Sequence, residues 1–476
     1  MDRTAIEEQG VPGYKLMQRA AKAAFSVAKE YYPRAGRWQV VCGGGNNAGD
    51  GYLLARLAAH DGIVVSVAAI IDPDKLSGDA ATAYLDFAAD GGIVVPWSDS
   101  LDESAELLVD AMLGSGLDRD LSGDFAHAVQ LMNAHTAPIH ALDIASGINA
   151  DTGSVMGSAV KADLTTTFVA LKPGLFLGSG PEHCGAVTFD SLGIDAELLS
   201  GISPLYRRLD SKSLRSFLPR RNRVAHKGDF GHVLVVGGGP GMPGAAQLCA
   251  EAALRSGAGR VSLATHPDHA ALIPTVRPEL MSHGVESGEQ LLALLKTADV
   301  VAFGPGLGQS EWADELYAVL ADYDGVAVWD ADALNMLAKT PTKMPKRVIT
   351  PHPGEAARLL QTDSSAIQAD RPAALASLLD KYGGTIVLKG AGTLVSAQSG
   401  PPYVCTAGNP GMAAPGMGDV LTGIIAALLA NGHELSIAAS VGVEVHARAG
   451  DIAATSGERG MLASDLLGAL RQVLNR

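Results

Sequence analysis

The sequence has few cysteines, no long apolar run and no excess of positive charge, and each absence excludes a class of protein. Only four cysteines occur in 476 residues, and no two of them are spaced as zinc ligands are. Scattered cysteines are typical of a reducing compartment rather than of a disulfide-stapled secreted protein. The net charge is 36 − 51 = −15 at neutral pH, which argues against nucleic acid or a membrane surface as a general partner.

We also expect no membrane-spanning or secretory segment. The longest apolar run follows Asp419 and is about half as long as a membrane span requires. Residues 1–32 are charged and have a helical period without a continuous apolar centre, unlike a signal peptide. These features predict a cytoplasmic protein.

The length and the apolar pattern predict two α/β domains. A chain of 476 residues exceeds the usual size of one domain. Apolar runs rich in β-branched residues alternate with alanine-rich helical stretches, as in parallel sheets covered by helices on both faces. The expected strands lie in 38–42, 63–70, 107–113, 138–144 and 164–170, and then in 232–238, 259–265, 299–305, 326–332, 347–352 and 385–390. We predict domains at residues 1–210 and 211–476.

A basic segment lies at the expected boundary. Residues 205–227 contain eight Lys or Arg residues and one acid. Such a run is typical of a solvated linker. An alternative interpretation is that His226 and Lys227, directly before an expected strand, reach a phosphate bound to the second domain.

The most informative segment is residues 407–419, which contain four glycines and two prolines and lead into an apolar helix. A helix start exposes unpaired N–H groups that suit a phosphoryl group or a developing oxyanion. Gly416 and Gly418 let the backbone approach a ligand closely. Asp419 is then the side chain able to take a proton from a substrate hydroxyl, although Asp is also a common helix cap.

In the first half, polar residues and glycines lie at the ends of three expected strands. They are Asn46, Asn47 and Asp50, then Asp110, Gly114, Gly116 and Arg119, and finally Asp143 and Ser146. The turn after the first strand lacks the GxGxxG spacing of a dinucleotide fingerprint. Because the carboxyl ends of parallel strands meet at one edge of a sheet, we expect one site. The side-chain oxygens of Asn47, Asp110 and Ser146 suit a hard monovalent or divalent cation.

In the second half, further polar or glycine-rich loops follow strands at 303–308, 329–335, 350–355 and 388–393. His352 stands between two prolines at a strand end, where a purely structural role is the alternative to a functional one. The segment KGAGT is similar to loops that contact phosphate or ribose. No single loop here is diagnostic, but the set as a whole points to a nucleotide site.

Together the motifs resemble a known family. NPGMAAPGMGDVLTG, TPHPGE, DADALN, LKGAGT and GPGLG are similar to the carbohydrate-kinase-type domain of the NAD(P)H-hydrate dehydratases. GGGNNAGDG, VDAMLGSGL and LDIASGI are similar to the NAD(P)H-hydrate epimerase domain that is often fused ahead of it. The resemblance covers essentially the whole chain. It implies a Rossmann-like three-layer sandwich followed by a ribokinase-like three-layer sandwich.

The resemblance implies a bifunctional metabolite-repair enzyme. The first domain would interconvert the R and S hydrates of NADH and NADPH. The second would restore the S form to NAD(P)H with ADP, as bacterial relatives do, and release AMP and phosphate. Potassium in the first domain, Mg²⁺ in the second and a homo-oligomeric state are also expected.

By the same resemblance, Asp419 and Asp143 are the expected catalytic carboxylates. The expected nucleotide-binding residues are Lys389, Gly390, Ala391, Gly392, Thr393 and Gly418. The expected substrate-binding residues of the second domain are Ala245, Gly306, Gly308, His352 and Asp419. Those of the first are Asn46, Asn47, Ala48, Gly49, Asp50, Gly114, Ser115, Gly116, Leu117, Asp118, Arg119, Asp120 and Asp143. The expected potassium ligands are Asn47, Asp110 and Ser146.

Two alternatives remain open at this point. The first is a small-molecule kinase of the ribokinase superfamily, which shares the GxGD turn but usually lacks the N-terminal domain. The second is that the N-terminal half is a non-catalytic nucleotide-binding or interaction module. The presence of Asn47, Asp110 and Asp143 argues against the second.

Overall fold

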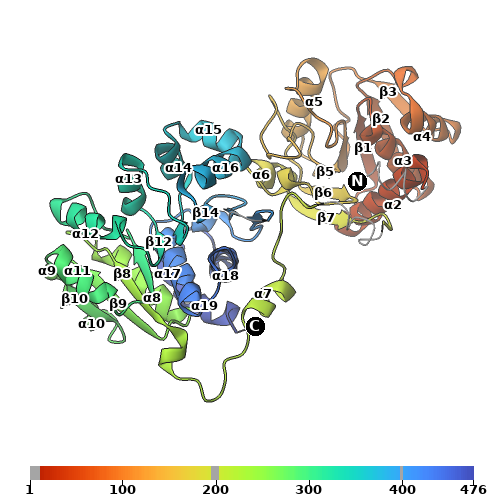
Figure 1. The fold of residues 1–476 in the computed structure, drawn as a ribbon. Helices are drawn as coiled ribbons and strands as arrows, with labels where there is room; N and C mark the ends of the chain where they lie inside the picture. The colour runs from red at the N-terminus through yellow and green to blue at the C-terminus, as the bar shows by residue number, and fades with distance from the viewer. Residues whose placement is uncertain (1–10, 195–202, 397–399, 476) are drawn as a thin grey trace. The chain divides into compact units, whose positions relative to one another are not determined.

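The computed structural model describes residues 11–194, 203–396 and 400–475. The chain divides into two compact units, Met1–Ser203 and Pro204–Arg476 (Figure 1). The division falls a few residues before the predicted boundary at residue 210. The reason is that Arg207 forms a parallel bridge with Tyr403, which draws the preceding segment into the second unit.

The first unit is built on a seven-stranded parallel sheet in the order β3-β2-β1-β4-β5-β6-β7. The strands are β1 (Arg37–Cys42), β2 (Val64–Ala69), β3 (Ile93–Pro96), β4 (Leu107–Ala111), β5 (Ile139–Leu142), β6 (Leu164–Phe168) and β7 (Ala186–Asp190). The five strands expected from apolar runs are confirmed. The two that were missed, β3 and β7, are the sheet edges, where exposed residues interrupt the apolar pattern.

Helices cover both faces of this sheet. They are α2 (Gly13–Tyr31), α3 (Asn46–His60), α4 (Gly78–Ala89), α5 (Gly123–Ala134) and α6 (Gly180–Cys184). Successive residues of β1 point to opposite faces: Val40 packs in the core formed with α2, α3 and α4, and Val41 in the core formed with α5. The expected three-layer arrangement is therefore present.

The second unit contains a nine-stranded sheet in the order β10-β9-β8-β11-β12-β13-β14-β15-β16. The strands are β8 (His232–Val236), β9 (Arg260–Thr265), β10 (Met281–Gly284), β11 (Val300–Phe303), β12 (Val326–Trp329), β13 (Arg347–Ile349), β14 (Thr385–Leu388), β15 (Leu394–Ser396) and β16 (Tyr403–Val404). The expectation of a wholly parallel sheet is wrong at one edge, where β15 runs antiparallel to both neighbours. β15 and β16 were missed because strands of three and two residues carry too little apolar sequence to be recognised, and β10 was missed because it is a partly exposed edge strand with the sequence MSHG.

Two layers of helices enclose this second sheet. The helices of the unit are α7 (Ser211–Phe217), α8 (Pro243–Arg255), α9 (Pro267–Ala270), α10 (Ile273–Val276), α11 (Gly288–Leu295), α12 (Glu311–Ala321), α13 (Asp332–Lys339), α14 (Pro353–Leu360), α15 (Ser364–Ala369), α16 (Arg371–Tyr382), α17 (Met417–Ala430), α18 (Leu435–Ala453) and α19 (Ala463–Val473). The core on one face is formed with α8, α17, α18 and α19. On the other face, the Tyr317 ring of α12 contacts the rings of Phe303 and Trp329.

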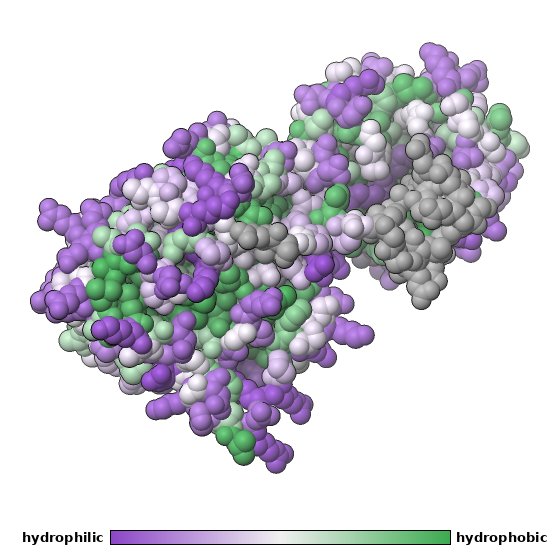
Figure 2. All heavy atoms as spheres, viewed as in Figure 1, coloured by the Kyte–Doolittle hydropathy of each residue, from purple (hydrophilic) through white to green (hydrophobic). Residues whose placement is uncertain are grey.

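The exterior carries both hydrophilic and hydrophobic side chains (Figure 2). Hydrophilic side chains cover much of the face drawn in Figure 2, and α17 is buried along nearly its whole length. Within the described residues, no helix combines the length and the apolar character that crossing a membrane requires.

Candidate active sites

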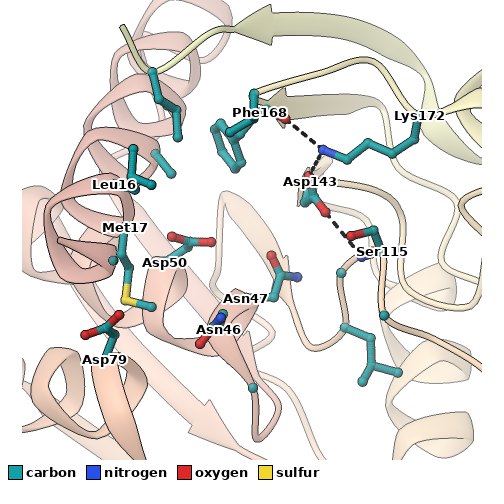
Figure 3. Close-up of a pocket in the computed structure, with 18 of the residues that line it drawn as sticks. Leu16, Met17, Asn46, Asn47, Asp50, Asp79, Ser115, Asp143, Phe168 and Lys172 are labelled. Atoms are coloured by element: carbon teal, nitrogen blue, oxygen red, sulfur yellow. Dashed lines mark hydrogen bonds and ion pairs between the residues drawn. The ribbon is translucent and has the colours of Figure 1, made fainter. Parts of the chain in front are cut away.

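The first unit has a cavity of about 430 Å³ at the carboxyl ends of its strands (Figure 3). The strand order reverses between β1 and β4, which is where open α/β sheets usually bind ligands. The lining includes the predicted residues Asn46, Asn47, Asp50, Gly114, Ser115, Gly116, Leu117 and Asp143, together with Leu16, Met17, Phe168 and Lys172. Residues from α2, α3 and the loops after β4, β5 and β6 thus form one site.

Asp143 lines this cavity and has an uncommon backbone conformation. Its φ is +71°, in the left-handed region that Asp tolerates better than most residues. One carboxylate oxygen accepts a hydrogen bond from the Ser115 N–H at 3.2 Å, and the other forms an ion pair with Lys172. The carboxylate is therefore oriented in the absence of a ligand, as suits an acid/base group.

Lys172 is a site residue that the sequence analysis missed. Besides Asp143, its ammonium donates to Thr167 Oγ1 at 3.0 Å and to the Phe168 carbonyl at 2.9 Å. An ammonium group has three hydrogens, so these three partners fix it in place. A signal was available, because Lys172 follows the expected strand 164–170 at the same sheet edge as Asp143.

Two of the three predicted cation ligands, Asp110 and Ser146, are in direct contact. Asp110 is fully buried and accepts hydrogen bonds from Ser146, at 2.8 Å from its N–H and 2.6 Å from its hydroxyl. Burial raises the pKa of Asp110 to about 6, although the bonds from Ser146 oppose the shift. The third, Asn47, lies beside Gly114, where an added side-chain carbon would lie 3.7 Å from the Asn47 amide carbon. Leu113, directly before Gly114, donates its N–H to Ser146 Oγ at 2.9 Å.

The buried side-chain amide of Asn47 is consistent with a bound cation. Its Oδ1 and Nδ2 are buried, and neither has a hydrogen-bond partner. A buried amide without partners costs free energy unless a ligand or water satisfies it. An oxygen-coordinated cation would satisfy Asn47 Oδ1 and would also favour the ionised form of Asp110.

Several predicted residues of the first unit do not line the cavity. Ala48 and Gly49 are buried in α3, and a side chain on Gly49 would approach Met17 Sδ to 2.5 Å. Asp118, Arg119 and Asp120 are exposed on the loop after β4. The tight packing of Gly49 explains its lack of a side chain without any ligand.

In the second unit, the glycine-rich loop ends at Gly416, which directly precedes α17 and has a φ of +87°. A side chain on Gly416 would also approach Leu248 Cδ1 to 2.7 Å, so glycine is required here for two reasons. Asp419 lies in the first turn of α17, and this helix has no side-chain cap. The alternative that Asp419 merely caps the helix is therefore wrong.

A buried ion pair faces the start of α17. Lys389 Nζ donates to Asp330 Oδ1 at 2.7 Å and lies 3.7 Å from Glu355 Oε2, while Thr422 donates to Asp330 Oδ2 at 2.9 Å. A side-chain carbon on Gly418 would lie 3.1 Å from Lys389 Nζ. The predicted nucleotide residues Lys389 and Gly418 are thus neighbours, with the lysine ammonium engaged by carboxylates.

This arrangement shifts the acidity of the carboxylates. Burial, followed by the negative charge of Asp330, raises the pKa of Asp419 to about 7, while Lys389 acts against the shift. Burial likewise raises the pKa of Glu355 to about 7. Burial also opposes ionisation of Asp330, but its ion pair with Lys389 holds the Asp330 pKa below the usual range. Asp330 therefore stays ionised while Asp419 titrates near neutral pH.

Apart from Asp419, the predicted hydrate-binding residues lie in the loops after β11 and β13 and at the start of α8. A side chain on Gly306 would approach Ala245 Cβ to 3.0 Å, so these two positions adjoin. The Gly308 N–H donates at 2.8 Å to Asp332, one of the negative groups that act on Asp419. His352 is half-exposed and caps α14 by accepting from the Gly354 N–H at 3.0 Å, so one nitrogen of its ring takes part in the helix cap.

The KGAGT loop rests on a buried arginine that the sequence analysis missed. Arg371 donates to the carbonyls of Leu388, Lys389 and Gly392 at 3.1–3.4 Å. The Thr393 hydroxyl donates to the Gly390 carbonyl at 2.9 Å and closes the loop. Ala391 is exposed at the tip. The sequence offers no signal for Arg371, which begins a helix remote from the loop in the chain.

The alternative interpretation of the basic segment is wrong. His226 accepts a hydrogen bond from the Gly228 N–H at 3.2 Å and caps the short turn that precedes β8. His226 and Lys227 therefore lie at the amino end of β8. Asp330 and Lys389 directly follow the carboxyl ends of β12 and β14, at the opposite edge of the parallel strands.

Comparison with known proteins covers both units. Residues 13–174 match the family described as YjeF-related protein N-terminus, and residues 233–472 match the family described as NAD(P)H-hydrate dehydratase. The bifunctional NAD(P)H-hydrate repair enzyme Nnr of Coxiella burnetii is 45% identical over 476 residues, which are 100% of this chain and 97% of the relative. The corresponding enzyme of Escherichia coli is 44% identical over 100% of this chain and 92% of its own. The chain belongs to the bifunctional NAD(P)H-hydrate repair enzymes.

A solved structure supports the fold of the second unit of this repair enzyme. A ribokinase-like superfamily protein from Enterococcus faecalis superposes with a TM-score of 0.53 at 30% identity, over 57% of this chain and 95% of that one. The region 13–174 holds Asn47, Asp110, Asp143 and Lys172, and the region 233–472 holds the cluster around Asp419. The comparisons favour a bifunctional repair enzyme over a kinase with an idle N-terminal module.

Proposed function

We propose that this enzyme epimerises the R and S hydrates of NADH and NADPH in residues 1–210 and dehydrates the S form in residues 211–476. The dehydration would use ADP and release AMP and phosphate. The observation that carries the proposal is the carboxylate of Asp419, placed at a glycine-rich helix start with its pKa raised to about 7. Such a group accepts a proton at neutral pH beside N–H groups that suit a phosphoryl group.

The dehydration proposed here begins with phosphoryl transfer. Hydroxide is a poor leaving group, so the ring hydroxyl first becomes a phosphate ester. Asp419 takes the hydroxyl proton as the oxygen attacks the terminal phosphorus of ADP, and the bond to AMP breaks. Phosphate then leaves the ring with the electrons of the C–O bond, and loss of a ring proton restores the double bond.

The proposed nucleotide site combines backbone and loop groups. Gly418 N–H and the loop Lys389, Gly390, Ala391, Gly392 and Thr393 would contact ADP, and Ala245, Gly306, Gly308 and His352 would line the hydrate site. Mg²⁺ would accompany the nucleotide and reduce the repulsion between its phosphates and an incoming oxygen. Within the described residues, no group of three His, Cys, Asp or Glu side chains is arranged to hold a metal. We therefore expect phosphate oxygens and water to supply most Mg²⁺ ligands.

In the first domain we propose that Asp143 is the acid/base at the hydrated ring carbon. Its ion pair with Lys172 keeps one carboxylate oxygen fixed, and the other faces Ser115. Asn47, Asp110 and Ser146 would hold K⁺, which would anchor the substrate by charge. The unpartnered amide of Asn47 supports this set.

We further propose a cytoplasmic location and a homo-oligomeric state. Four unpaired, buried cysteines fit a reducing compartment. Sedimentation of the purified protein measures the oligomeric state directly.

The test is conversion of a mixture of R and S NADH hydrate, with K⁺ and Mg²⁺ and with either ADP or ATP. Absorbance of the reduced nicotinamide reports the product. We expect full conversion with ADP, faster than spontaneous epimerisation. Conversion of the S fraction alone would contradict the role of the first domain, and absence of NADH with both nucleotides would contradict that of the second.

Dehydration should slow as the pH falls through about 7. The proposed base works as a carboxylate, and the pKa of Asp419 is raised to about 7 by burial and by the charges of Asp330, Asp332 and Glu355 against Lys389. The logarithm of kcat should therefore rise with slope one and level off above about pH 7. In Glu355→Gln, which lacks one of these negative charges, the midpoint should move lower. A rate that is constant between about pH 6 and about pH 8 would contradict the role of Asp419.

A further inference from the structure

Arg371 is held at the start of α16, beside the KGAGT loop. The side chain of Asp370 caps this helix by accepting a hydrogen bond from the Ala373 N–H at 2.9 Å. Leu375 and Leu378 of the helix are buried, and α16 packs against β14, the strand that leads into the loop (Figure 1). The backbone of Arg371 is therefore fixed relative to the loop.

The guanidinium of Arg371 binds three carbonyls of this region. Its Nη2 donates to the carbonyls of Leu388, Lys389 and Gly392 at 3.1, 3.3 and 3.4 Å, and its Nη1 donates to the Lys389 carbonyl at 3.3 Å. The fit is close, because a side-chain carbon on Gly390 would come within 2.9 Å of Nη1. One planar group thus contacts both the start and the end of the loop.

The positive charge of Arg371 has no carboxylate partner among the described residues. The side chain is 1% exposed, and this burial lowers its pKa to about 10. Besides the loop, the Gln368 side chain accepts a hydrogen bond from Nη1 at 3.0 Å. A buried charge without an opposite charge costs free energy that an apolar side chain of similar size would not. The carbonyls that the guanidinium holds therefore explain its presence better than packing does.

The loop needs this support because it contains two glycines with positive φ. Gly390 has a φ of +139° and Gly392 a φ of +65°. Glycine loses more conformational freedom than any other residue when a loop becomes ordered. The Thr393 hydroxyl donates to the Gly390 carbonyl at 2.9 Å and closes the loop on itself, whereas Arg371 ties the loop to α16. A loop that is already ordered avoids the entropic cost of ordering when a ligand binds.

We propose that Arg371 is a positioning residue for the nucleotide: by holding three carbonyls, it keeps the KGAGT loop in the conformation that binds ADP. The inference rests on the proposed function, because it concerns the loop assigned there to the nucleotide. Arg371 acts through the loop and does not itself contact ADP. Its loss should therefore weaken ADP binding, while the chemistry at Asp419 on α17 continues at nearly the wild-type rate once ADP is bound.

The experiment compares Arg371→Met, which has no donors, with Arg371→Lys, which keeps the charge but not the planar fork. In the Met variant we expect KM for ADP to rise by about 10- to 30-fold, while kcat at saturating ADP changes by less than about threefold. The Lys variant should lie between, with a rise in KM of about three- to tenfold. Calorimetry gives the Kd of ADP without turnover, and the Kd values should follow the KM values.

Arg347→Met is the matched control for the loss of a buried guanidinium. Arg347 is also 1% exposed, donates to the Thr342 carbonyl at 2.6 Å and lies over the Trp329 ring. It is the first residue of β13, which runs parallel to β14, so it lies at the sheet edge opposite the KGAGT loop. KM for ADP should therefore stay within about threefold of the wild-type value in this variant.

The unfolding temperature of each variant shows how much of the protein is folded. An unchanged KM for ADP in Arg371→Met, or an equal rise in Arg347→Met, would overturn the positioning role alone. Should the Met variant fail to fold, the Lys variant decides, and a wild-type KM in that variant would overturn the role. Wild-type protein that binds ADP without dehydrating the hydrate would overturn the proposed function, and the Kd values would still decide the role of Arg371. Wild-type protein that binds no ADP would overturn both.

Discussion

Replacing Asp419 by Asn should lower kcat for ADP-dependent dehydration by about 10³-fold while epimerisation by the same chain stays unchanged. Asn has the shape of Asp but cannot take the proton of the ring hydroxyl. The binding loops are untouched, so KM for ADP should change little. Stopped assays of AMP release and of NADH formation measure the effect.

The stability of this variant has an expected sign. The pKa of Asp419 is raised above its unfolded value, so its ionisation destabilises the folded protein as the pH rises from about 4 toward about 7. Asn removes that ionisation. The unfolding temperature at about pH 8 should therefore be no lower than that of the wild type. The control is Asp322→Asn, an exposed carboxylate at the end of α12. Dehydration within tenfold of wild type in Asp419→Asn would remove Asp419 from the role of base.

Replacing Asp143 by Asn should lower epimerisation by about 10²- to 10⁴-fold and leave dehydration of the S hydrate intact. Asn can still accept the Ser115 N–H, so the loop after β4 keeps its anchor. It cannot shuttle a proton, and it leaves the charge of Lys172 without its ion-pair partner. The loss of proton transfer and the unpaired charge of Lys172 both affect the part of the cavity where we expect the hydrated ring carbon to bind.

The two activities in one chain make this measurement direct. With ADP present, the variant should convert the S fraction of a hydrate mixture at the wild-type rate and the R fraction only at the rate of spontaneous epimerisation. Asp124→Asn, at an exposed position in the first turn of α5, is the control. Should the R fraction disappear as fast as in the wild type, Asp143 would not be the acid/base.

The predictions from sequence are correct for features that a local pattern of residues determines. Continuous apolar runs predicted the buried strands β1 and β8 because a strand covered on both faces must be apolar throughout. Polar residues that follow the strands of the first unit predicted a site at the carboxyl edge of its sheet, and the cavity lined by Asp143 lies at that edge. The edge strands β3 and β16 escaped this reasoning, since partial exposure or shortness removes the pattern.

By itself, the sequence determined the two α/β domains and the repair-enzyme family, and it predicted Asp419 at a helix start and Asp143 after a strand as the site carboxylates. Only the tertiary structure decided what surrounds those carboxylates. Lys172 meets Asp143, and Lys389 with Asp330 faces the start of α17, through contacts between segments distant in the chain. The same packing raises the pKa of Asp419 and leaves Asp118 to Asp120 outside the cavity. Burial and electrostatic coupling depend on distances in space, and no local pattern of residues encodes them.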